Sequence, residues 1–246
     1  MKAVVFGGTT GIGRAIARRL AERGDAVFLM GLDVDELVQS AADLRARHPE
    51  RAEIGYAVCD LEKPEGFAAA LDAADAALGA FDAVIVTAAM FASQEALEAD
   101  VELTRRLVTV NYAHTVVFCE HARKRLLSRG GGRLVVFSSV AGDRGRKPVA
   151  IYGSSKAGLA IYLEALDHKF HASGLSVTCV KPGFVKTGMT AGLKPPPFAG
   201  EPEQVAADVV RALDRGKPVV YTPGIWALVM LVIRALPRFV MRKIGF

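Results

Sequence analysis

The sequence predicts an α/β fold, a doubly wound parallel sheet of seven strands with helices on both faces. Two observations lead to this prediction. Short apolar runs alternate along the chain with longer stretches of helical character, which is typical of repeated strand–helix–strand units. Several of these runs consist almost entirely of Val, Ile, Leu and Phe, as expected for parallel strands buried on both faces. A chain of 246 residues can form one such domain.

The expected elements follow one another along the chain. Apolar runs that are too short for helices predict strands over residues 3–6, 26–31, 53–58, 83–87, 133–138, 176–181 and 218–221. Longer stretches between them predict helices over residues 13–22, 34–47, 66–78, 101–128 and 155–172. These helices imply right-handed crossovers between the strands. Residues 187–202 are irregular and Pro-rich, and we expect either a lid over a substrate pocket or an ordinary surface loop there.

The basic charge of the chain is concentrated at one end. Hydrophobic residues make up 51% and charged residues 23% of the chain, which is the composition of a globular protein. The formal net charge is +5, but residues 223–246 contain Arg234, Arg238, Arg242 and Lys243 and no acidic residue. The remainder is therefore close to neutral, and we expect no general nucleic-acid-binding surface.

The three cysteines, Cys59, Cys119 and Cys179, are far apart and have apolar neighbours. This arrangement predicts buried thiols rather than a disulfide or a metal site, and we expect no bound metal ion. The odd count and the lack of a CxxC pair indicate a reducing compartment. Met1-Lys2 leads directly into the first expected strand, so we expect no signal peptide and a cytoplasmic location.

A glycine-rich segment, Gly7-Gly8-Thr9-Thr10-Gly11-Ile12-Gly13, lies between the first expected strand and the first expected helix. Glycines there permit a tight turn and close approach of the backbone to a phosphate. The N-terminus of the helix supplies free N–H groups and the positive end of the helix dipole. The segment therefore predicts a site for the pyrophosphate of a dinucleotide, with a purely structural turn as the alternative.

The choice between NAD and NADP depends on residues near the end of the second strand. An acid there would bind the ribose hydroxyls of NAD, whereas an Arg would favour the 2′-phosphate of NADP. Asp33 lies there with no adjacent Arg, which favours NAD(H). Alternatively, Asp33 is only the N-cap of the helix that follows it. Asp60, at the end of the third strand, is expected either to contact the adenine or simply to end the strand.

Tyr152 and Lys156 are one helical turn apart, and Tyr152 lies thirteen residues after Ser139. A tyrosine hydroxyl has a pKa of about 10, and a lysine ammonium on the same helix face favours the phenolate. Ser139 follows an expected strand and can bind a substrate oxygen. The set predicts proton exchange with that oxygen while hydride passes to or from a nicotinamide. For the Tyr/Lys motif taken alone, a surface Tyr and a solvated Lys is the alternative.

Over residues 1–221 the chain resembles the single-domain short-chain dehydrogenases/reductases, which have a Rossmann-like fold. The matching motifs are Gly7-x-x-x-Gly11-x-Gly13, Val110-Asn111, Ser138-Ser139-Val140-Ala141-Gly142, Tyr152-x-x-x-Lys156 and Pro182-Gly183-Phe184-Val185-x-Thr187. The resemblance implies an NAD(P)(H)-dependent oxidoreductase that acts on the CH–OH group of a small molecule, and a homodimer or homotetramer. We expect residues 1–222 to form the catalytic domain and residues 223–246 an amphipathic basic tail.

The resemblance also implies roles for single residues. Tyr152 would be the general acid/base, Ser139 the ligand of the substrate oxygen, and Lys156 both a modifier of the Tyr152 pKa and a ribose ligand. Asn111 would hold a water molecule that links Lys156 to solvent, and Ser138 would only pack at its strand end. The expected cofactor contacts are Gly7, Thr9, Thr10, Gly11, Ile12, Gly13, Asp33, Asp60, Ala88, Lys156, Pro182, Gly183, Val185 and Thr187.

Two stretches depart from the family pattern. The usual Asn-Asn-Ala-Gly after the fourth strand is replaced by Thr87-Ala88-Ala89-Met90, so the polar support of the cofactor must differ there. Gly31 stands where NAD-preferring members often have Asp, and Leu32 where NADP-preferring members often have Arg. The proton-transfer residues are all present, which argues against a non-catalytic dinucleotide-binding sensor.

The tail combines an apolar run, from Trp226 to Ile233, with Arg234, Arg238 and Arg242 at four-residue spacing. A helix with this pattern suits the interface of an anionic membrane. The run is too short to span a bilayer, and Pro237 should bend or break the helix. Packing at a subunit interface or over the substrate pocket is the equal alternative.

The tail also resembles that of the decaprenylphosphoryl-2-keto-ribose reductase branch, through Tyr221-Thr-Pro-Gly and a Leu-Pro-Arg ending. This resemblance implies a lipid-linked keto-sugar as substrate and a peripheral position on the inner face of the membrane. The alternative is a soluble carbonyl or steroid-type reductase whose tail forms an oligomer.

Overall fold

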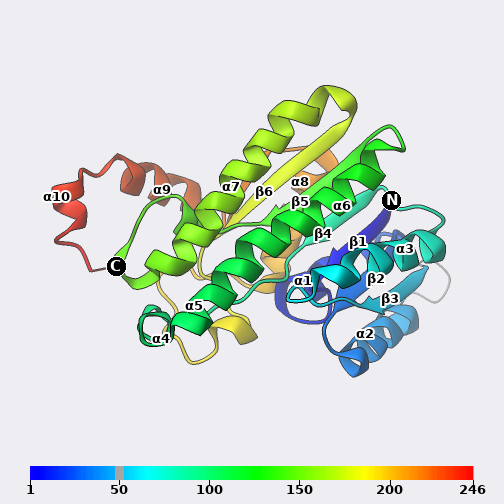
Figure 1. Cartoon of the computed structure of the whole chain (residues 1–246), viewed down its shortest axis with the longest axis horizontal. Helices are drawn as coiled ribbons and strands as arrows, with labels where there is room; N and C mark the ends of the chain where they lie inside the picture. The colour runs from blue at the N-terminus through cyan, green and yellow to red at the C-terminus, as the bar shows by residue number, and fades with distance from the viewer. Residues whose placement is uncertain (48–52, 246) are drawn as a thin grey trace.

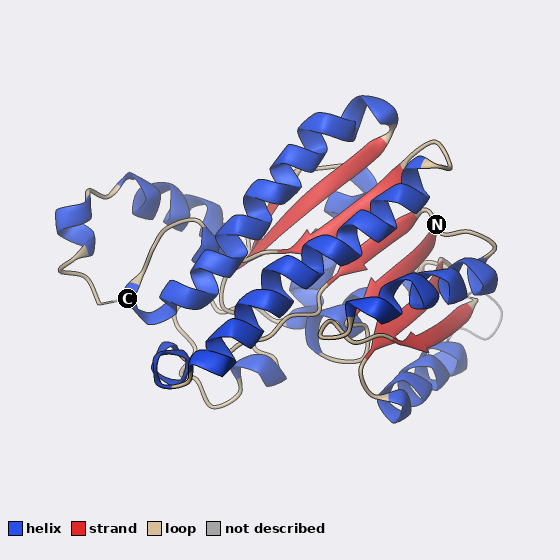
Figure 2. Ribbon diagram, in the orientation of Figure 1, coloured by secondary structure: helices blue, strands red, loops and turns tan. Residues whose placement is uncertain are grey.

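A computed structural model describes residues 1–47 and 53–245 of the protein. Its centre is a seven-stranded parallel sheet with strand order β3-β2-β1-β4-β5-β6-β7 (Figures 1 and 2). The strands are β1 (Lys2–Phe6), β2 (Ala26–Gly31), β3 (Ile54–Val58), β4 (Ala83–Val86), β5 (Gly132–Phe137), β6 (Leu175–Pro182) and β7 (Val219–Thr222). The predicted α/β fold and the seven expected strands are confirmed.

Helices cover both faces of the sheet. The helices of the described residues are α1 (Gly11–Glu22), α2 (Val34–Arg47), α3 (Phe67–Leu78), α4 (Gln94–Ala99), α5 (Val101–Val108), α6 (Thr115–Leu127), α7 (Ala150–Phe170), α8 (Pro202–Arg215), α9 (Ile225–Ala235) and α10 (Arg238–Met241). Figure 1 shows α5, α6 and α7 in front of the sheet and α8 behind it. The arrangement is the doubly wound one that the alternating pattern predicts.

Two hydrophobic cores lie on the two faces, because neighbouring side chains of a strand point in opposite directions. In β1, Val4 and Phe6 pack with α3, α6 and α7, whereas Ala3 and Val5 pack with α1, α2 and α8. All four side chains are buried. The central strands are therefore apolar on both faces, which explains their continuous apolar sequence.

The strand order reverses beside β1. From β1 the chain moves outward to β2 and β3, and then returns to β4 on the other side of β1. The connections after β1 and β4 consequently diverge and leave a crevice at the carboxyl ends of these strands, where ligands of open α/β sheets bind. The glycine-rich loop and the residues after β4 both lie at this edge.

The predicted helices differ from the observed ones in four places, one of which is the short helix α4, which was not expected. The expected helix 101–128 is interrupted by a π-helical segment, Thr109–His114; there the Thr115 hydroxyl donates to the carbonyl oxygen of Val110 at 2.8 Å. The helix expected at 155–172 begins earlier, at Ala150. Gly153 is a weak helix former, but its missing side chain allows contact with Ala141, since a Cβ there would lie 2.7 Å from the Ala141 oxygen. Helix α8 was not expected and fills part of 187–218.

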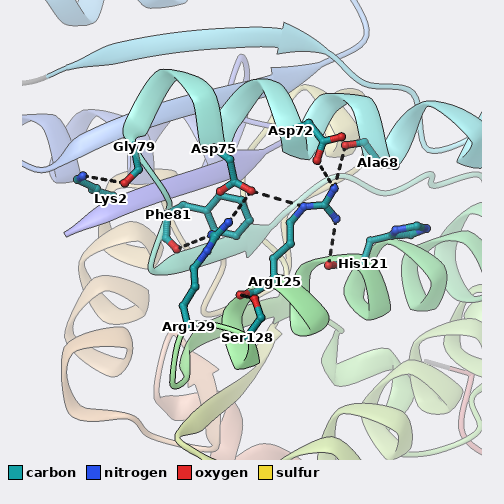
Figure 3. Close-up of polar contacts among 10 residues, drawn as sticks. All are labelled: Lys2, Ala68, Asp72, Asp75, Gly79, Phe81, His121, Arg125, Ser128 and Arg129. Carbon is teal, nitrogen blue, oxygen red and sulfur yellow. Dashed lines mark hydrogen bonds and ion pairs between the residues drawn. The ribbon is translucent and has the colours of Figure 1, made fainter.

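Ion pairs join α3 to the end of α6 (Figure 3). The Arg129 guanidinium lies 2.7 Å from the Asp75 carboxylate, and Arg125 pairs with both Asp72 and Asp75. Lys2 donates to the carbonyl oxygen of Gly79 at 3.2 Å, just beyond the C-terminus of α3. These contacts lie near the amino ends of β1 and β4, at the opposite edge from the crevice, so they stabilise the layer without taking part in the site.

The tail, described up to Gly245 with Phe246 outside the described residues, forms α9 and α10. It projects from the opposite side of the molecule to the N-terminus (Figure 1). The two helices are separated at Pro237, as the sequence predicts. Met230 and Ile233 are buried against Val140, and Arg144 donates to the Leu236 carbonyl oxygen at 2.6 Å. Among the described residues no helix is both long and apolar enough to cross a membrane.

Candidate active site

A cleft of about 740 Å³ opens at the carboxyl ends of the strands. It begins at the glycine-rich loop, passes the ends of β4, β5 and β6, and ends against α9. Predicted site residues that line it are Gly7, Thr10, Gly11, Ile12, Gly13, Ala88, Ser139, Tyr152, Lys156, Pro182, Gly183, Val185 and Thr187. Thr9, Asp33, Asp60 and Asn111 lie outside its lining. One cavity thus brings together most of the predicted site residues, which are far apart in the sequence.

The glycine-rich loop has little room for side chains. Gly7 has a φ of +88°, and a Cβ on Gly13 would lie 2.0 Å from the Gly7 oxygen. The Thr10 side chain makes no capping bond, and the first bond inside α1 runs from the Arg14 N–H to the Thr10 oxygen. Among the described residues, this leaves the N–H groups of Gly11, Ile12 and Gly13 free at the cleft. Free N–H groups at a helix N-terminus fit a pyrophosphate group.

The two acids predicted to contact the cofactor are both engaged in local turns. The Asp33 carboxylate accepts a hydrogen bond from the Glu36 N–H at 3.0 Å, which is the capping arrangement. The Asp60 carboxylate accepts from the Glu62 N–H at 2.8 Å. Thr9 is buried beside Gly31. Each carboxylate retains free lone pairs, so contacts with ribose and adenine stay predictions.

Tyr152 lies in the first turn of α7, which directs its side chain into the cleft. Its ring meets that of Phe91 edge to face, with ring centroids 5.2 Å apart. Burial raises the pKa of the Tyr152 hydroxyl to about 12, and a hydrogen bond with Ser139 opposes this shift. The Ser139 oxygen also accepts from the Ala141 N–H at 3.1 Å, which fixes the serine at the end of β5. The two hydroxyls therefore lie close together at the cleft.

Lys156 is buried one turn after Tyr152. Its ammonium donates to the Phe137 carbonyl oxygen at 3.0 Å and lies 5.8 Å from the centroid of the Tyr152 ring. Burial lowers the pKa of Lys156 to about 8. Ser138 donates to the Lys156 carbonyl oxygen at 2.8 Å, so it joins the end of β5 to α7, in line with its predicted packing role.

Asn111 supports the stretch that departs from the family pattern. It lies fully buried in the π-helical segment, and its amide bonds both backbone groups of Met90, accepting from N–H at 2.7 Å and donating to the oxygen at 2.8 Å. Thr87 donates to the carbonyl oxygen of Phe6 at 3.0 Å. These bonds hold the segment after β4 without the usual asparagines. Water binding by Asn111 stays a prediction.

The segment after β6 forms the far wall of the cleft. Gly183 lies against Trp226 of α9, because a Cβ on this glycine would lie 2.0 Å from the indole nitrogen. That nitrogen donates to the Phe198 carbonyl oxygen at 3.2 Å. Thr187 caps a 3-10 turn, Gly188–Thr190, in a reciprocal pair with Thr190. Residues 187–202, expected to be either a lid or a surface loop, thus contribute to the cleft, and the tail closes one end of it.

Comparisons with known proteins agree with this geometry. The family model described as short chain dehydrogenase matches residues 1–197. The chain belongs to the short-chain dehydrogenase/reductase family. It is 36% identical over 243 residues to an uncharacterized oxidoreductase of Mycobacterium tuberculosis, which covers 98% of this chain and 95% of that protein. It is 30% identical over 218 residues to carbonyl reductase family member 4 of Xenopus tropicalis, covering 85% of this chain and 89% of that protein.

A solved structure of the same short-chain dehydrogenase/reductase fold is that of an actinorhodin polyketide ketoreductase variant with NADPH. The TM-score is 0.80 at 25% sequence identity, with 89% of this chain and 94% of the other covered. The protein is accordingly an oxidoreductase of this family.

Phe91 and Arg146 were not singled out by the sequence analysis, which treated Trp226 only as part of the tail. Trp226, Phe91 and Arg146 all line the cavity of this short-chain dehydrogenase/reductase. Arg146 lies between the Ser139 and Tyr152 motifs, so its position in the sequence was a usable signal. The place of Trp226 depends on the path of the chain after β7 and had no local signal. The three cysteines are buried free thiols, as predicted.

Proposed function

We propose that this protein moves hydride between a nicotinamide and a ketone or secondary alcohol, with Tyr152 as the general acid/base. The observation that supports this most directly is the pairing of Tyr152 with Ser139 and Lys156 in the cleft that starts at the glycine-rich loop. Tyr152 is protonated at neutral pH, since its pKa is about 12. It is therefore prepared to donate a proton, which favours reduction of a carbonyl.

Each protein group has a defined part in this proposal. The Ser139 hydroxyl binds the carbonyl oxygen beside Tyr152. Tyr152 donates its proton to that oxygen, and the Lys156 ammonium stabilises the phenolate that remains. Proton return to Tyr152 proceeds through Lys156 and a water held at Asn111. A bound nicotinamide supplies the hydride in reduction and accepts it in oxidation. In the alcohol-to-ketone direction the same groups act in reverse.

For the cofactor we propose NAD(H) over NADP(H), on the strength of Asp33 near the end of β2. The groups expected to hold it line the cleft: the N–H groups of the α1 N-terminus, the segment after β4, Lys156 and the segment after β6. Titration with NADH and NADPH tests the preference. Tenfold tighter NADH binding, about 1.4 kcal/mol, supports a ribose contact by Asp33. Tighter NADPH binding means that Asp33 only caps α2.

Replacing Tyr152 by Phe tests the proposed function. The change removes the proton donor and keeps the ring against Phe91, so we expect kcat to fall by about 100- to 10,000-fold while cofactor affinity stays within about twofold. Steady-state rates on a panel of ketones and fluorescence titration with the nucleotides measure both. Tyr56→Phe, on the partly exposed β3 strand, is the matched control. A non-catalytic sensor would bind the nucleotides equally well and show no turnover, with or without the Tyr152→Phe substitution.

A second proposal concerns the tail. Helix α9 exposes Leu228, Leu231 and Val232, and the adjoining residues are basic without any acid. This combination supports contact with an anionic membrane surface, which suits a lipid-linked keto-sugar as substrate. The alternative is a soluble carbonyl or steroid-type reductase in which the same face is covered in a homodimer or homotetramer.

A further inference from the structure

One charged side chain of the cleft has no part in the proposed hydride transfer. Arg146 precedes a 3-10 turn, Lys147–Val149, that leads into α7, and it lines the cavity six residues before Tyr152. Its Nε atom is buried and has no hydrogen-bond partner in the part of the chain that the structure describes. An arginine placed this way is missing an acceptor.

Two of the nearby charged side chains, Asp143 and Lys156, are bound to other groups. Asp143, three residues before Arg146, accepts from Lys181 and from the Tyr221 hydroxyl, both at 2.6 Å. The Lys156 ammonium is bonded to Phe137. Glu95 also lines the cleft, but it is exposed and forms no ion pair with Arg146 in the described part of the chain. The guanidinium is thus an unmatched positive charge at the substrate end of the cavity.

Burial opposes this charge without removing it. Desolvation lowers the pKa of Arg146, and the charge of Asp143 raises it. Arginine nevertheless keeps its proton in proteins, because the guanidinium is by far the most basic side chain. A partly buried cation without an acceptor destabilises the protein, and a bound anion relieves that cost. The planar guanidinium matches the two oxygens of a carboxylate or phosphate.

Most of the larger side chains at this end of the cavity, apart from Gln94 and Glu95, are apolar. Val149, Phe184, Met189, Leu193 and Trp226 form its walls. A ligand that fills the space therefore has an apolar body. The pyrophosphate of the cofactor is expected elsewhere, at the α1 N-terminus after β1, so Arg146 is not needed to hold it.

We propose that Arg146 binds an oxyanion of the substrate, a carboxylate or a phosphate, so that the preferred substrate is a carbonyl compound with an apolar body and an acidic group. This assignment of substrate class rests on the proposed function, because it places the carbonyl at Tyr152 and the acid at Arg146. Arg146 touches the substrate in this arrangement and determines specificity, without taking part in proton transfer.

Fluorescence of Trp226, the single tryptophan of the chain, reports ligands in the cleft without turnover. We would titrate the protein, with and without saturating NAD⁺ or NADP⁺, with cyclohexanecarboxylate, cyclohexyl phosphate and cyclohexanol. At least one acid is expected to bind about tenfold or more tightly than the alcohol, because a charge-assisted bond adds to the shared apolar contact. Which acid binds more tightly distinguishes a carboxylate substrate from a phosphate substrate.

Arg146→Gln is expected to remove the preference for the acids, and Arg146→Lys to restore part of it. Arg105→Gln is the matched loss of charge on the exposed surface of α5, where Arg105 pairs with Glu102 at 2.8 Å, and should leave the preference unchanged. In turnover, Arg146→Gln should lower kcat/KM for 4-oxocyclohexanecarboxylate by about 30-fold and for cyclohexanone by less than about threefold.

Equal binding of the three ligands by the wild-type protein overturns the proposal, even if the Arg146 variants do not fold. Equal loss of acid and alcohol binding in a folded Arg146→Gln overturns it as well. Failure of the proposed function has a different signature: the nucleotides do not bind, or Tyr152→Phe leaves ketone turnover unchanged. Titration without nucleotide still decides the role of Arg146 in that event.

Discussion

Burial shifts the pKa values of Tyr152 and Lys156 in opposite directions. The pKa of the tyrosine is raised to about 12 and that of the lysine is lowered to about 8. Desolvation favours the neutral form of each group, which explains both signs. Tyr152 consequently stays protonated across the physiological range, whereas Lys156 titrates just above it.

This difference predicts the pH dependence of carbonyl reduction. The Lys156 ammonium, needed to stabilise the Tyr152 phenolate, is present below its pKa and lost above it. The kcat/KM for reduction should therefore be constant below about pH 7 and fall as the pH rises through about 8. Initial rates between about pH 6 and 10, with checks that the enzyme survives each pH, measure the profile. A profile that stays flat over this whole range contradicts the assignment.

Gly13 provides a second test at the scale of one residue. A Cβ at this position would lie 2.0 Å from the Gly7 oxygen, so the loop must move to admit it. Gly13→Ala should lower the free energy of unfolding by about 1–3 kcal/mol and weaken nucleotide binding. Urea unfolding and fluorescence titration measure the two effects. Gly66→Ala is the control, because a Cβ there meets nothing within 4 Å; equal behaviour of the two variants contradicts the prediction.

Among the elements, the π-helical segment between α5 and α6 affects the site most. The wider turn places Asn111 inside the protein, where it bonds both backbone groups of Met90. Since Met90 follows β4 at the edge of the cleft, the helix holds the segment expected to line the cofactor. The ion pairs between α3 and α6 act at the other end of the layer and keep the helices in place (Figure 3).

Asn111→Ala should affect both stability and activity. It leaves the N–H and oxygen of Met90 without their partner, which should lower the free energy of unfolding by about 1–3 kcal/mol. Asn111→Asp keeps the acceptor for the N–H group but loses the donor to the oxygen. Urea unfolding, nucleotide titration and kcat of both variants distinguish structural support of Met90 by Asn111 from a role of Asn111 in the proton relay. A large fall in kcat with unchanged stability would mean that Asn111 acts on the proton path alone.

At the scale of the whole molecule, the tail has two different faces. Met230 and Ile233 pack on the domain, and Trp226 closes the cleft, whereas Leu231 and Val232 are exposed. The alternatives that the sequence leaves open for the tail are thus compatible: one face can pack over the pocket while the other contacts a membrane or a second subunit. The inner face is part of the site, and a membrane or a second subunit remains a proposal for the outer face.

We expect the protein to bind vesicles of phosphatidylglycerol at low salt, and binding to weaken in high salt because the basic residues are screened. Leu231→Glu should abolish binding, whereas Val101→Glu, at an exposed position on α5, should not. Sedimentation with vesicles and light scattering after gel filtration are the measurements. If the wild type ignores the vesicles and Leu231→Glu converts an oligomer to monomers, the face is a subunit interface.

The sequence by itself determined the parts of this protein that depend on neighbouring residues. Continuous apolar runs predict buried parallel strands, the glycine-rich loop predicts an α1 N-terminus open to phosphate, and four-residue spacing puts Tyr152 and Lys156 on one helix face. These features follow from local backbone geometry, so a single segment suffices to predict each. The match of the family model over residues 1–197 agrees with them.

Only the tertiary structure decided which residues contact one another around the cleft. Asn111 reaches Met90, Trp226 lies against Gly183, and Arg146 faces the cavity without an acceptor among the described residues. The π-helical segment likewise interrupts a continuous helical pattern. Each outcome depends on packing between segments distant in the chain, where local propensity is overridden by the need to fill space and to satisfy buried polar groups.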